Sequence, residues 1–562
     1  MNWKIGSKGE AVDRIVNILL ANRGLKTKKE IDEFLNPPDP LSYSFADLLI
    51  NTTQLRKAVT RILKAVSKKE PIVVYGDYDA DGICAAAIMW EALQTCRADA
   101  LPYIPQREKE GYGLSKEGID NVLRDTKYQI QNTSGVTKGR SWGLIIAVDS
   151  GIVAHDAVGY AKSKGLDVII VDHHEKPETL PKTSAIVHTT KLCAAGIAYY
   201  VSSQLVADRR SLTAWLELAA VATVTDLMPL IGPNRSIVKY GLEALNKTAR
   251  PGLRALFSVA GIKKIGAYEI GYLIGPRLNA SGRIESALTA LRLLCTKNDE
   301  KALAFAGLLD KTNKDRQLMV ETQTRHALAG YEQNSSPRER IIVINHESYH
   351  QGVIGLIAGK LVEKYYLPSI VIARGEVLSK ASARSISGFN IIEAIRATQN
   401  ILVNAGGHPM AAGFTIETAR IEEFESKIKK IAKAKISPGM LERTLRIDVS
   451  IPLDFITFQL YELLTQLAPF GLGNPEPVFA SRGILESFRT VGADGKHLKL
   501  QILAAGGGRV PAASLDAIAF NQGSAAEKLI VGQPVFVAYS VALDTFNNHP
   551  KIQLKIKDIR HD

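Results

Sequence analysis

Short apolar segments alternate with longer helical patterns through the first half of the chain. Four of them are rich in β-branched residues, at 72–75, 144–148, 168–171 and 185–187. Continuous apolar runs of this length are typical of strands buried on both faces of a parallel sheet, and helical stretches lie between most of them. The pattern therefore predicts an α/β domain built on a parallel sheet.

The segments around this domain follow other patterns. Apolar residues from Ala11 to Leu19 recur at helical spacing, so residues 1–50 predict a helical lead that ends at the proline-rich segment 36–40. Residues 127–141 are polar and predict a surface loop. Residues 299–332 have a helical composition without proline, which favours a long connecting helix that ends by 337.

Two further regions follow the connecting helix. A second α/β unit opens with the apolar run 341–344 and closes near residue 435, before a Ser-Pro-Gly linker at 437–439. From residue 440 the chain has short strand patterns, such as 498–503 and 534–539, separated by glycine turns. This pattern predicts a small β-barrel, and an oligonucleotide-binding (OB) barrel is one candidate.

Composition and charge narrow the class of protein. The chain has 562 residues, of which 46% are hydrophobic and 23% charged, so it is a globular protein of several domains. Its 70 Lys and Arg exceed its 57 Asp and Glu by 13. Such a surplus favours a polyanionic partner such as nucleic acid, although a merely basic enzyme is the alternative. Residues 440–562 hold 12 basic and 12 acidic side chains, so the surplus lies in residues 1–439.

Cysteine usage and hydropathy point to a compartment. The four cysteines, at 84, 96, 193 and 295, form no C-x-x-C pair and so predict neither a disulfide framework nor a zinc ribbon. The first residues lack the apolar segment of a secretory signal, and no apolar run approaches the roughly 18 residues of a spanning helix. We therefore expect a soluble, cytoplasmic protein.

Three carboxylates follow the first predicted strand within five residues, at Asp77, Asp79 and Asp81. They repel one another unless cations neutralise them, and hard divalent cations prefer such oxygen ligands. The D-x-D-x-D-G pattern also opens a calcium-binding EF-hand. That interpretation fails because Ile88 occupies the twelfth position and because a strand precedes the motif. An acidic turn without a ligand is the remaining alternative.

Two more predicted strands end in acidic residues. Asp149 follows the second, and Asp172, His173 and His174 end the third. Ligands of open parallel sheets gather outside the carboxyl ends of the strands, so we expect these side chains to converge. A mixed set of carboxylates and imidazoles suits Mn²⁺ or Mg²⁺, whereas a lone Asp is as often a helix cap. Asp226 ends an apolar stretch, where its charge needs a partner.

One motif resembles a different enzyme. Residues 346–350 match H-E-x-x-H, the signature of zinc proteases, which requires both histidines on one face of a helix. Here a strand pattern at 341–344 precedes the motif and Gly352 follows it closely. We therefore predict a strand-to-helix loop and reject the metalloprotease interpretation.

Taken together, the acidic motifs resemble those of the DHH phosphoesterase superfamily in order and spacing. Further motifs resemble its exonucleases that act on single-stranded DNA, and the resemblance covers about residues 15–562. These motifs are R-E-K-E-G-Y-G at 107–113, P-R-L-N-A-S-G-R at 276–283, G-V-I-G at 352–355, S-A-R-S at 382–385, G-G-H at 406–408 and P-F-G-L-G-N-P-E-P at 469–477. Each motif alone is weak, and their combination is specific.

The resemblance implies a catalytic domain with two divalent ions, Mn²⁺ or Mg²⁺. Asp149 would bridge the ions, Asp79 would hold the first, and His174 would face the scissile phosphate. The second ion would be held by Asp81, His173 and Asp226, with Asp77 and Asp172 supporting the ligands from behind. Many relatives have a histidine ligand where this chain has Tyr75, so the first site differs from theirs.

The resemblance also implies phosphate and DNA contacts outside the metal site. In the second α/β unit, glycines 406 and 407 allow close approach of a phosphate that His408 could contact. The other candidates are polar or basic residues of the shared motifs, namely Arg107, Arg277, Asn279, Arg283, Ser382 and Arg384. Outside the family context, a solvated surface arginine and a plain glycine turn are the simpler interpretations. The pocket would lie between the two α/β units and recognise a 5′ end.

The predicted barrel carries aromatic and basic residues that suit single-stranded nucleic acid. Phe488, Lys496, His497 and Lys499 lie near predicted strand faces. Stacking aromatics flanked by cations bind single strands, although a phenylalanine in a barrel is more often part of its core. These four residues are our candidate DNA contacts in the barrel.

The resemblance implies the following organisation and function. Residues 51–298 would form the DHH catalytic domain, 299–337 the connecting helix, 338–436 the DHH-associated domain and 440–562 the OB-like domain. The protein would be a monomeric exonuclease that degrades single-stranded DNA from the 5′ end to 5′-mononucleotides in repair and recombination, with single-strand-binding protein and a helicase as partners. Two alternatives are a DHH phosphodiesterase for short RNA or cyclic dinucleotides, and a non-catalytic scaffold at replication forks. The barrel argues against the first, and the retained ligands argue against the second.

Overall fold

The structure is a computed structural model of the chain. It describes residues 1–9, 12–106, 110–111, 113–124, 143–284, 286–334, 339–504, 514–544 and 550–561. These residues form two compact units. One is built from residues 3–275, 290–303 and 445–562, and the other from residues 1–2, 276–289 and 304–444.

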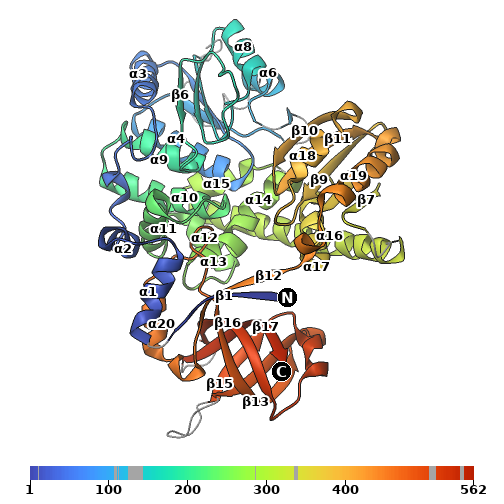
Figure 1. Ribbon diagram of the computed structural model, residues 1–562. Coiled ribbons are helices and arrows are strands. Elements are labelled where there is room, and N and C mark those ends of the chain that lie inside the picture. Colours follow the sequence, from blue (N-terminus) through green and yellow to red (C-terminus); the bar gives the residue numbers. More distant parts are fainter. Residues whose placement is uncertain are drawn as a thin grey trace. The chain divides into compact units, whose positions relative to one another are not determined.

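A five-stranded parallel sheet organises the first α/β domain (Figure 1). Its strands lie in the order β3-β2-β4-β5-β6, and every neighbouring pair runs parallel. They are β2 (Ile72–Tyr75), β3 (Ala100–Tyr103), β4 (Leu144–Val148), β5 (Asp167–Asp172) and β6 (Ala185–His188). The four apolar runs predicted as strands are confirmed. Strand β3 was not apparent from the sequence because it contains Pro102, a residue that sheets accept at an edge such as this one.

Helices cover both faces of this sheet. Tyr75, Ile145 and Ile170 share a buried cluster with apolar residues of α6 (Lys116–Arg124) and α8 (His155–Ser163). On the other face, α4 (Ala80–Thr95), α9 (Ala194–Ser203) and α10 (Arg209–Thr225) pack against one another. Helix α3 (Thr52–Lys68) lies beside the edge strand β6. Coverage of both faces explains why these strands are continuously apolar.

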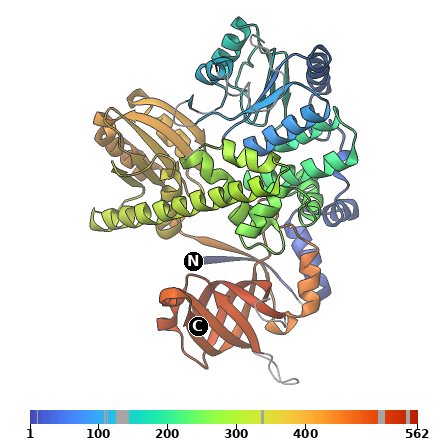
Figure 2. The same ribbon diagram turned by 180° about the vertical axis from the view of Figure 1, so that it is seen from behind.

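The chain then adds a series of helices before the second α/β domain. They are α11 (Gly232–Leu245), α12 (Pro251–Val259), α13 (Ala267–Glu269), α14 (Gly275–Ile284), α15 (Leu288–Cys295) and α16 (Asp299–Asn334). A five-residue π-helix at Ile270–Ile274 joins α13 to α14. Helix α16 is continuous over 36 residues, as its yellow-green ribbon shows (Figure 2). The predicted connecting helix begins at the expected residue, and its expected end at 335–337 lies outside the described residues.

The second α/β domain has a mixed five-stranded sheet in the order β10-β11-β9-β8-β7, in which only β7 and β8 pair in parallel. Its strands are β7 (Ile342–His346), β8 (Ser369–Ala373), β9 (Leu378–Arg384), β10 (Leu402–His408) and β11 (Ala411–Glu417). Its helices are α17 (Ile354–Tyr365), α18 (Ile391–Arg396) and α19 (Ile421–Lys435). Phe414 and Phe424 lie in the core between the sheet and α19. Helix α17 packs on the other face, together with α16.

The C-terminal region forms the predicted barrel. Strands β13, β14, β15, β17 and β16 pair in that order, and β13 also pairs with β16, so that the ring of five strands is closed. The elements are β12 (Thr444–Ser450), α20 (Phe458–Thr465), β13 (Phe479–Val491), β14 (His497–Ala504), β15 (Ser514–Ala519), β16 (Pro534–Asp544) and β17 (Lys551–His561). Closure removes the exposed edges that an open sheet of this size would present.

The N-terminal lead differs from the helical segment that was predicted. Its first element is strand β1 (Asn2–Lys8), which pairs with β12 of the barrel sheet (Figure 1). Helices α1 (Val12–Asn22) and α2 (Lys28–Leu35) follow it, as the spacing predicts. Ile15 and Leu19 of α1 are fully buried in the same core as the barrel strands. The strand was missed because residues 2–8 alternate weakly and have few apolar side chains, so that only their distant partner strand reveals them.

Among the helices described, none has an apolar stretch long enough to cross a lipid bilayer.

Candidate active site

The first acidic group lies where β2 leads into α4. Asp79 caps the helix, and its Oδ1 accepts hydrogen bonds of 3.0 Å from the backbone N–H groups of Asp81 and Gly82. Asp77 is buried directly behind this turn, and a Cβ on Gly82 would lie only 2.6 Å from the Asp77 nitrogen. The glycine of the motif is therefore needed for the close approach of the two backbone segments.

Asp149 follows β4 in an unusual backbone conformation. Its φ is +59°, in the left-handed region, which costs energy for a residue other than glycine, asparagine or aspartate. The side chain is buried, and its Oδ1 has no hydrogen-bond partner in the described structure. That oxygen lies 3.3 Å from Nε2 of His173. The strand end therefore holds the carboxylate against the imidazole rather than in a helix cap.

Asp172, the last residue of β5, positions both histidines. Its Oδ1 accepts hydrogen bonds from the backbone N–H groups of His173 (2.7 Å) and His174 (3.2 Å), and its Oδ2 from that of Ile152 (3.0 Å). Oδ1 also lies 2.7 Å from Nδ1 of His174. Burial would raise the pKa of Asp172, but these hydrogen bonds and the charge of His174 outweigh it and lower the pKa. Asp172 thus supports the histidines from behind, as expected.

The pKa of His174 shifts in the opposite direction to that of Asp172. Burial would lower its pKa, but the hydrogen bond to Asp172 and the negative charge of that residue together raise it. Because Nδ1 faces Asp172, Nε2 is the ring nitrogen that could contact a substrate. The Asp172–His174 pair is therefore a proton-bearing group held at the sheet edge.

Asp81 and Asp226 complete the group from two helices. Asp81 is fixed by hydrogen bonds from the backbone N–H groups of Ala194 (2.7 Å) and Ala195 (2.8 Å) at the start of α9. Asp226 is the C-cap of α10, so the apolar stretch before it is a buried helix rather than a strand. Its Oδ2 lies 3.8 Å from Nδ1 of His173, and Asp81 Oδ2 lies 3.7 Å from Nε2 of the same ring.

Three overlapping groups have ligand atoms within 4.8 Å of one another. They are Asp77, Asp79 and Asp149; Asp81, His173 and Asp226; and Asp149, His173 and His174. The structure thus brings together all the acidic and histidine residues that the sequence nominated at the sheet edge. Asp149 and His173 each belong to two of the groups, so the three groups form one continuous cluster. Asp77, which the resemblance places behind the ligands, lies close enough to Asp79 and Asp149 to be a ligand itself.

The protonation equilibria of this cluster depend on cations. Burial, and then the neighbouring carboxylates, raise the pKa values of Asp77, Asp149 and Asp226, the last to about 8. Burial also lowers the pKa of His173, so that this ring is held neutral and can act as a ligand. Asp77 Oδ1 and Asp149 Oδ1 are buried without a hydrogen-bond partner among the described residues. This donor set, with orphaned carboxylate oxygens and a neutral imidazole, fits Mn²⁺ or Mg²⁺.

Tyr75 does not take part in these groups. Its hydroxyl donates a 3.1 Å hydrogen bond to the carbonyl oxygen of Gly113, and burial raises the pKa of the phenol. The side chain instead belongs to the core beneath α6. The potential ligand group around Asp79 therefore consists of Asp77, Asp79 and Asp149, without Tyr75.

The predicted phosphate contacts in α14 are engaged within their own unit. Arg277 forms a 2.8 Å ion pair with Asp310 of α16, and Nη1 of Arg283 donates a 3.2 Å hydrogen bond to the carbonyl oxygen of Gly352. Asn279 lies half-buried on the same helix. Arg107 lies outside the described residues. These contacts give Arg277 and Arg283 a structural role whether or not they also meet a phosphate.

Ser382, Arg384 and His408 share one face of the second sheet. Cross-strand pairing aligns His408 with Ala411 and then Arg384, and Gly406 with Gly413 and then Ser382. Opposed residues in a sheet point to the same side, so the three polar side chains lie on the face that carries α17, opposite the core formed with α19. Gly406 and Gly413 have no side chains, so they leave the sheet backbone uncovered at these positions.

A cavity of about 720 Å³ lies beside Arg384, between α16 and α17. Burial lowers the pKa values of Arg384 and Arg316, and within the described structure no carboxylate pairs with either guanidinium. Arg316 Nε and Thr324 Oγ1 are buried without hydrogen-bond partners in the part of the chain that is described. Sequence reasoning missed Arg316 and Thr324, because on a long polar helix they do not differ from ordinary surface residues. Buried guanidinium groups without a carboxylate fit an anionic ligand.

The H-E-x-x-H segment at residues 346–350 forms the loop that leads from the end of β7 towards α17, as predicted. Strand β7 ends at His346 and α17 begins at Ile354, so the two histidines of the H-E-x-x-H segment do not share a helix. His346 Nδ1 lies 2.8 Å from Ser348 Oγ and forms no ligand group within the described residues. This excludes the zinc-protease geometry.

The four residues proposed as DNA contacts in the barrel differ in whether they face its core or its surface. Phe488 is opposite the buried Leu500 and is partly buried against the barrel core, so a DNA contact by this ring stays a prediction. Lys499 faces outward opposite Arg489, and Lys496 is exposed. His497 lies edge-on to Phe520, with ring centroids 5.4 Å apart.

Phe520 is the aromatic residue that the sequence analysis missed on this surface. It is half exposed and directly follows β15. Its position after an alternating strand pattern is the only signal that could have indicated it.

Three family matches cover most of the chain. Residues 71–223 match the DHH family, N-terminal domain; residues 338–434 match the DHHA1 domain; and residues 447–558 match the RecJ OB domain. These ranges correspond to the parallel sheet with its helices, the mixed sheet and the barrel.

Curated proteins and solved structures give the same result. The chain is 35% identical to the single-stranded-DNA-specific exonuclease RecJ of Bacillus subtilis, over 97% of this chain and 67% of that protein. It is 31% identical to that of Thermus thermophilus, over 96% of this chain and 74% of the relative. The crystal structure of T. thermophilus RecJ with Mn²⁺ superposes with a TM-score of 0.82 at 28% identity, covering all of this chain and 80% of that one. A further structure of exonuclease RecJ bound to manganese matches at 31% identity and a TM-score of 0.58, covering 69% of this chain and 96% of that one.

Proposed function

The chain belongs to the RecJ family of single-stranded-DNA-specific exonucleases, and from this premise we propose that it hydrolyses single-stranded DNA from the 5′ end to 5′-mononucleotides. The observation that carries the proposal is the cluster at the edge of the parallel sheet, where Asp149 belongs to two potential ligand groups. We assign catalysis to residues 51–298, the connection to 299–337, the DHH-associated domain to 338–436 and the OB-like domain to 440–562. We propose that this hydrolysis of single-stranded DNA is part of DNA repair and recombination.

Two divalent ions, Mn²⁺ or Mg²⁺, are the cofactors of this site. When bound, they supply an activated water and neutralise charge on the phosphate and the leaving oxygen. Asp149 would be shared between them, with Asp77 and Asp79 on one side. The other side would be formed by Asp81, His173 and Asp226. The orphaned oxygens of Asp77 and Asp149 support these roles.

His174 would face the scissile phosphate. Its Nδ1 is held by Asp172, so Nε2 would donate the hydrogen bond to a non-bridging oxygen. The hydrogen bond to Asp172 and its negative charge raise the pKa of His174, which favours the charged imidazole, and a charged donor stabilises the developing negative charge better than a neutral one. Removal of Asp172 should therefore lower the pKa of His174 as well as disorder its ring.

Recognition of the 5′ end would come from the second α/β domain. Arg384 has no carboxylate partner in the described structure and lies beside Ser382, whose hydroxyl could donate to the same phosphate. We add Arg316 to this set, because its side chain lines the same cavity and no carboxylate pairs with it in the described structure. A guanidinium fork matches a terminal phosphate in two places. His408, Asn279, Arg277, Arg283 and Arg107 would contact the strand next to it.

The barrel would bind the strand beyond the active site. Lys496 and Lys499 supply charge, and His497 with Phe520 supplies aromatic surface for stacking. A phosphodiesterase for very short RNA or cyclic dinucleotides has no need of such a surface. A scaffold without activity has no need of the complete ligand set. We propose single-strand-binding protein and a helicase as partners, and a monomeric protein in the cytoplasm.

Degradation of end-labelled DNA tests this function. With Mn²⁺, the protein should release mononucleotides from a 5′-labelled single strand, and should leave duplex DNA, RNA and cyclic dinucleotides largely intact. Release of label first from the 3′ end would contradict the proposed polarity. Faster hydrolysis of cyclic dinucleotides or short RNA would favour the alternative phosphodiesterase.

A further inference from the structure

Helix α3 has a charge pattern that the catalytic function does not use. Over its 17 residues it carries five cations and no acidic side chain. The cations are Arg56, Lys57, Arg61, Lys64 and Lys68. Positions 57, 61, 64 and 68 are three or four residues apart, so they form a stripe along one face of the helix. An amphipathic helix usually balances its exposed charges, and this one does not.

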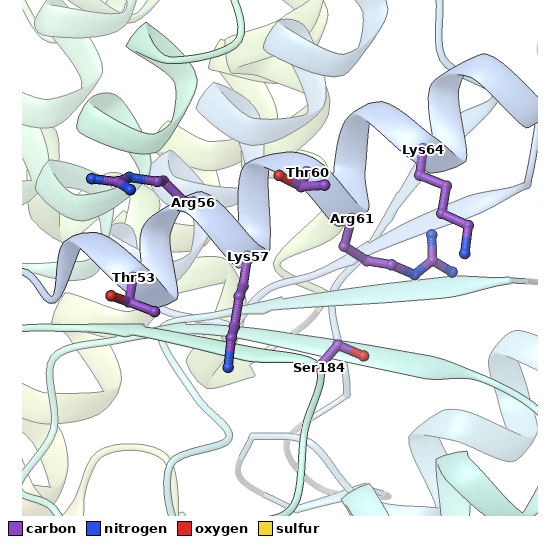
Figure 3. A pocket seen from close by; sticks show the side chains of 7 residues that line it. All are labelled: Thr53, Arg56, Lys57, Thr60, Arg61, Lys64 and Ser184. Carbon is purple, nitrogen blue, oxygen red and sulfur yellow. The ribbon is translucent and has the colours of Figure 1, made fainter.

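The stripe borders a groove against the edge strand β6 (Figure 3). Gln54 Oε1 accepts a 3.1 Å hydrogen bond from the Ile186 backbone N–H, which fixes the helix beside the strand. The groove has a volume of about 430 Å³ and opens to solvent. It is lined by Thr53, Arg56, Lys57, Thr60, Arg61, Lys64 and Ser184.

Arg61 lies within this groove with one donor unused. Its Nε forms a 2.6 Å ion pair with Asp167, and its Nη2 a 2.8 Å ion pair with Glu70. Its side chain is only 14% exposed, and its Nη1 is buried without a hydrogen-bond partner among the described residues. A buried N–H group of a charged side chain is costly to leave unpaired. The two acids fix the guanidinium, so Arg61 is a rigid, positively charged part of the groove wall.

The groove walls add cations and hydroxyl groups. Lys57 and Lys64 are exposed, and within the described structure neither has a carboxylate partner. Both extend from the helix on the side of Ser184, as does Arg61, whereas Arg56 extends elsewhere (Figure 3). The hydroxyl of Ser184 forms no hydrogen bond with any described residue. Lysines, a guanidinium and hydroxyl donors are the groups that proteins use to bind nucleic-acid phosphates.

The groove is remote from the metal ligands. The partners of Arg61 lie where strands begin: Glu70 precedes β2, and Asp167 is the first residue of β5. The proposed ligands lie at the opposite, carboxyl ends of the strands. Strands of four to six residues separate the two edges by about 15 Å at roughly 3.3 Å per residue. A phosphate in the groove is therefore not the one that is hydrolysed.

We propose that this groove binds the phosphate backbone of a nucleic acid whose end occupies the active site. The groove would contact the nucleic acid independently of its sequence, and it would be separate from both the terminal-phosphate pocket and the barrel. This proposal rests on the proposed function. Nucleic acid is favoured over an acidic protein segment because the substrate of this family is itself a polyanion and because serine and threonine donors accompany the cations. The contact would matter only for nucleic acids long enough to reach from one sheet edge to the other.

The test is the double variant Lys57→Gln/Lys64→Gln, which keeps Arg61 and its two ion pairs intact. A matched control is Lys263→Gln/Lys264→Gln, which removes the same charge from two exposed lysines in a loop of the same unit. Affinity is measured without divalent ions, so that the DNA stays intact, for strands of about 40 and about 6 nucleotides. Thermal melting of all three proteins confirms that they are folded.

We expect the groove variant to bind the long strand about tenfold more weakly at low salt, with little change for the short strand. Each lysine that neutralises a phosphate of a single strand adds roughly 0.7 to the slope of log K against log salt, so removal of both should lower that slope by about 1.4. Hydrolysis of the short strand with Mn²⁺ should be unchanged.

Three results would overturn the proposal. The first is an unchanged affinity and salt slope for the long strand. The second is an equally weakened affinity in the control variant, which would indicate net charge alone. The third is normal DNA binding together with abolished binding of a polyglutamate peptide, which would indicate that the groove receives an acidic protein segment. Failure of the proposed exonuclease polarity would leave these binding results unaffected, so the two hypotheses are tested separately.

Discussion

Nε2 of His173 lies 3.3 Å from Oδ1 of Asp149, an oxygen that has no hydrogen-bond partner among the described residues. Burial lowers the pKa of the imidazole and raises that of the carboxyl group, so the pair is not held together as an ordinary ion pair. The two side chains come from the ends of adjacent parallel strands. Their closeness is the geometry expected of ligands that converge on a cation.

Replacement of Asp149 tests the shared ligand. Asp149→Asn should lower the Mn²⁺-dependent nuclease rate by several orders of magnitude, because the variant loses the charge of a buried carboxylate that belongs to two of the three potential ligand groups. Asparagine is the appropriate replacement because it tolerates the positive φ at this position, which alanine tolerates poorly. Rates on a 5′-labelled strand and thermal melting should be measured together.

Without metal, the same variant should be at least as stable as the parent. The buried carboxylate is then uncompensated, and its replacement by a neutral amide removes a desolvation cost. Added Mn²⁺ should raise the melting temperature of the parent much more than that of Asp149→Asn. A folded variant that keeps its activity would contradict the assignment of Asp149.

Arg384 should control the preference for a 5′-phosphate. The parent protein should degrade a 5′-phosphorylated strand faster than the same strand with a 5′-hydroxyl. Arg384→Ala should reduce the rate on the phosphorylated strand more than on the hydroxyl strand, because a guanidinium fork rewards the extra charge of a terminal phosphate. Arg384→Lys should restore the preference poorly, since lysine lacks the fork.

Arg316 offers a matched comparison in the same cavity. Arg316→Ala should reduce the same preference if its side chain contacts the terminal group. An equal decrease in rate on both strands for Arg384→Ala would mean that this residue grips the backbone generally and that polarity arises elsewhere.

Glu217 should make stability depend on pH. Burial raises its pKa from 4.5 to about 7, although Thr248 donates a 2.8 Å hydrogen bond to it and Arg250 lies nearby. Below about pH 4.5 the group is protonated in both the folded and the unfolded state. Between about pH 4.5 and 7 the unfolded state loses the proton more readily, so the free energy of unfolding falls with rising pH and levels off above 7.

Glu217→Gln should remove this part of the pH dependence and raise stability at pH 8 by on the order of 2 kcal/mol. Urea unfolding at several pH values measures the effect, and Glu243→Gln on the exposed surface of α11 serves as the control. An unchanged pH profile in Glu217→Gln would mean that Arg250 compensates the buried charge in full.

The barrel surface is best tested by single substitutions. Phe520→Ala should weaken binding of long single strands by about 1–3 kcal/mol if a base stacks on this ring, while hydrolysis of very short strands stays nearly unchanged. Phe488→Ala is the contrasting variant: the native ring packs against the core, so its removal should lower stability instead. Tight binding of long strands by a folded Phe520→Ala variant would exclude this ring from the DNA-binding surface.

Removal of the whole barrel is a poorer experiment. Ile15 and Leu19 of the N-terminal lead share the core of the barrel, so truncation before residue 440 would expose them to water. Weak binding by such a protein would not separate DNA contact from misfolding.

The parallel sheet and its ligand edge could be predicted because local signals coincide there. The run at 144–148 is apolar and β-branched nearly throughout, and Asp149 follows it directly, so both the strand and its functional end are visible in one window of sequence. Asp81 was visible in its acidic motif and Asp226 as a charge that ends an apolar stretch, but their convergence rests on helices that pack against the sheet, which the sequence alone does not place.

Other features depend on contacts that the sequence does not record. Strand β1 was missed because its pairing partner β12 lies near the other end of the chain. The partial burial of Phe488 against the core was not apparent, because periodicity alone does not say which face of a barrel strand is inside. Arg316 is unremarkable on a helix until its cavity is known. In each case tertiary packing, rather than local preference, decides the role.

The pairing of β1 with β12 also bears on how the protein is made. Strand β1 and helix α1 are synthesised before both α/β domains, whereas the barrel to whose sheet and core they belong closes only when β16 and β17 have been synthesised. At roughly 5–20 residues per second, that segment waits on the order of half a minute or longer for its partner. During this time its apolar residues Ile15 and Leu19 lack their native core, and the two α/β domains can fold before it. Strand β1 and helix α1 therefore lack their native core for longer than either α/β domain does, and a bulky fusion placed directly before β1 should slow maturation of the barrel more than that of the catalytic domain.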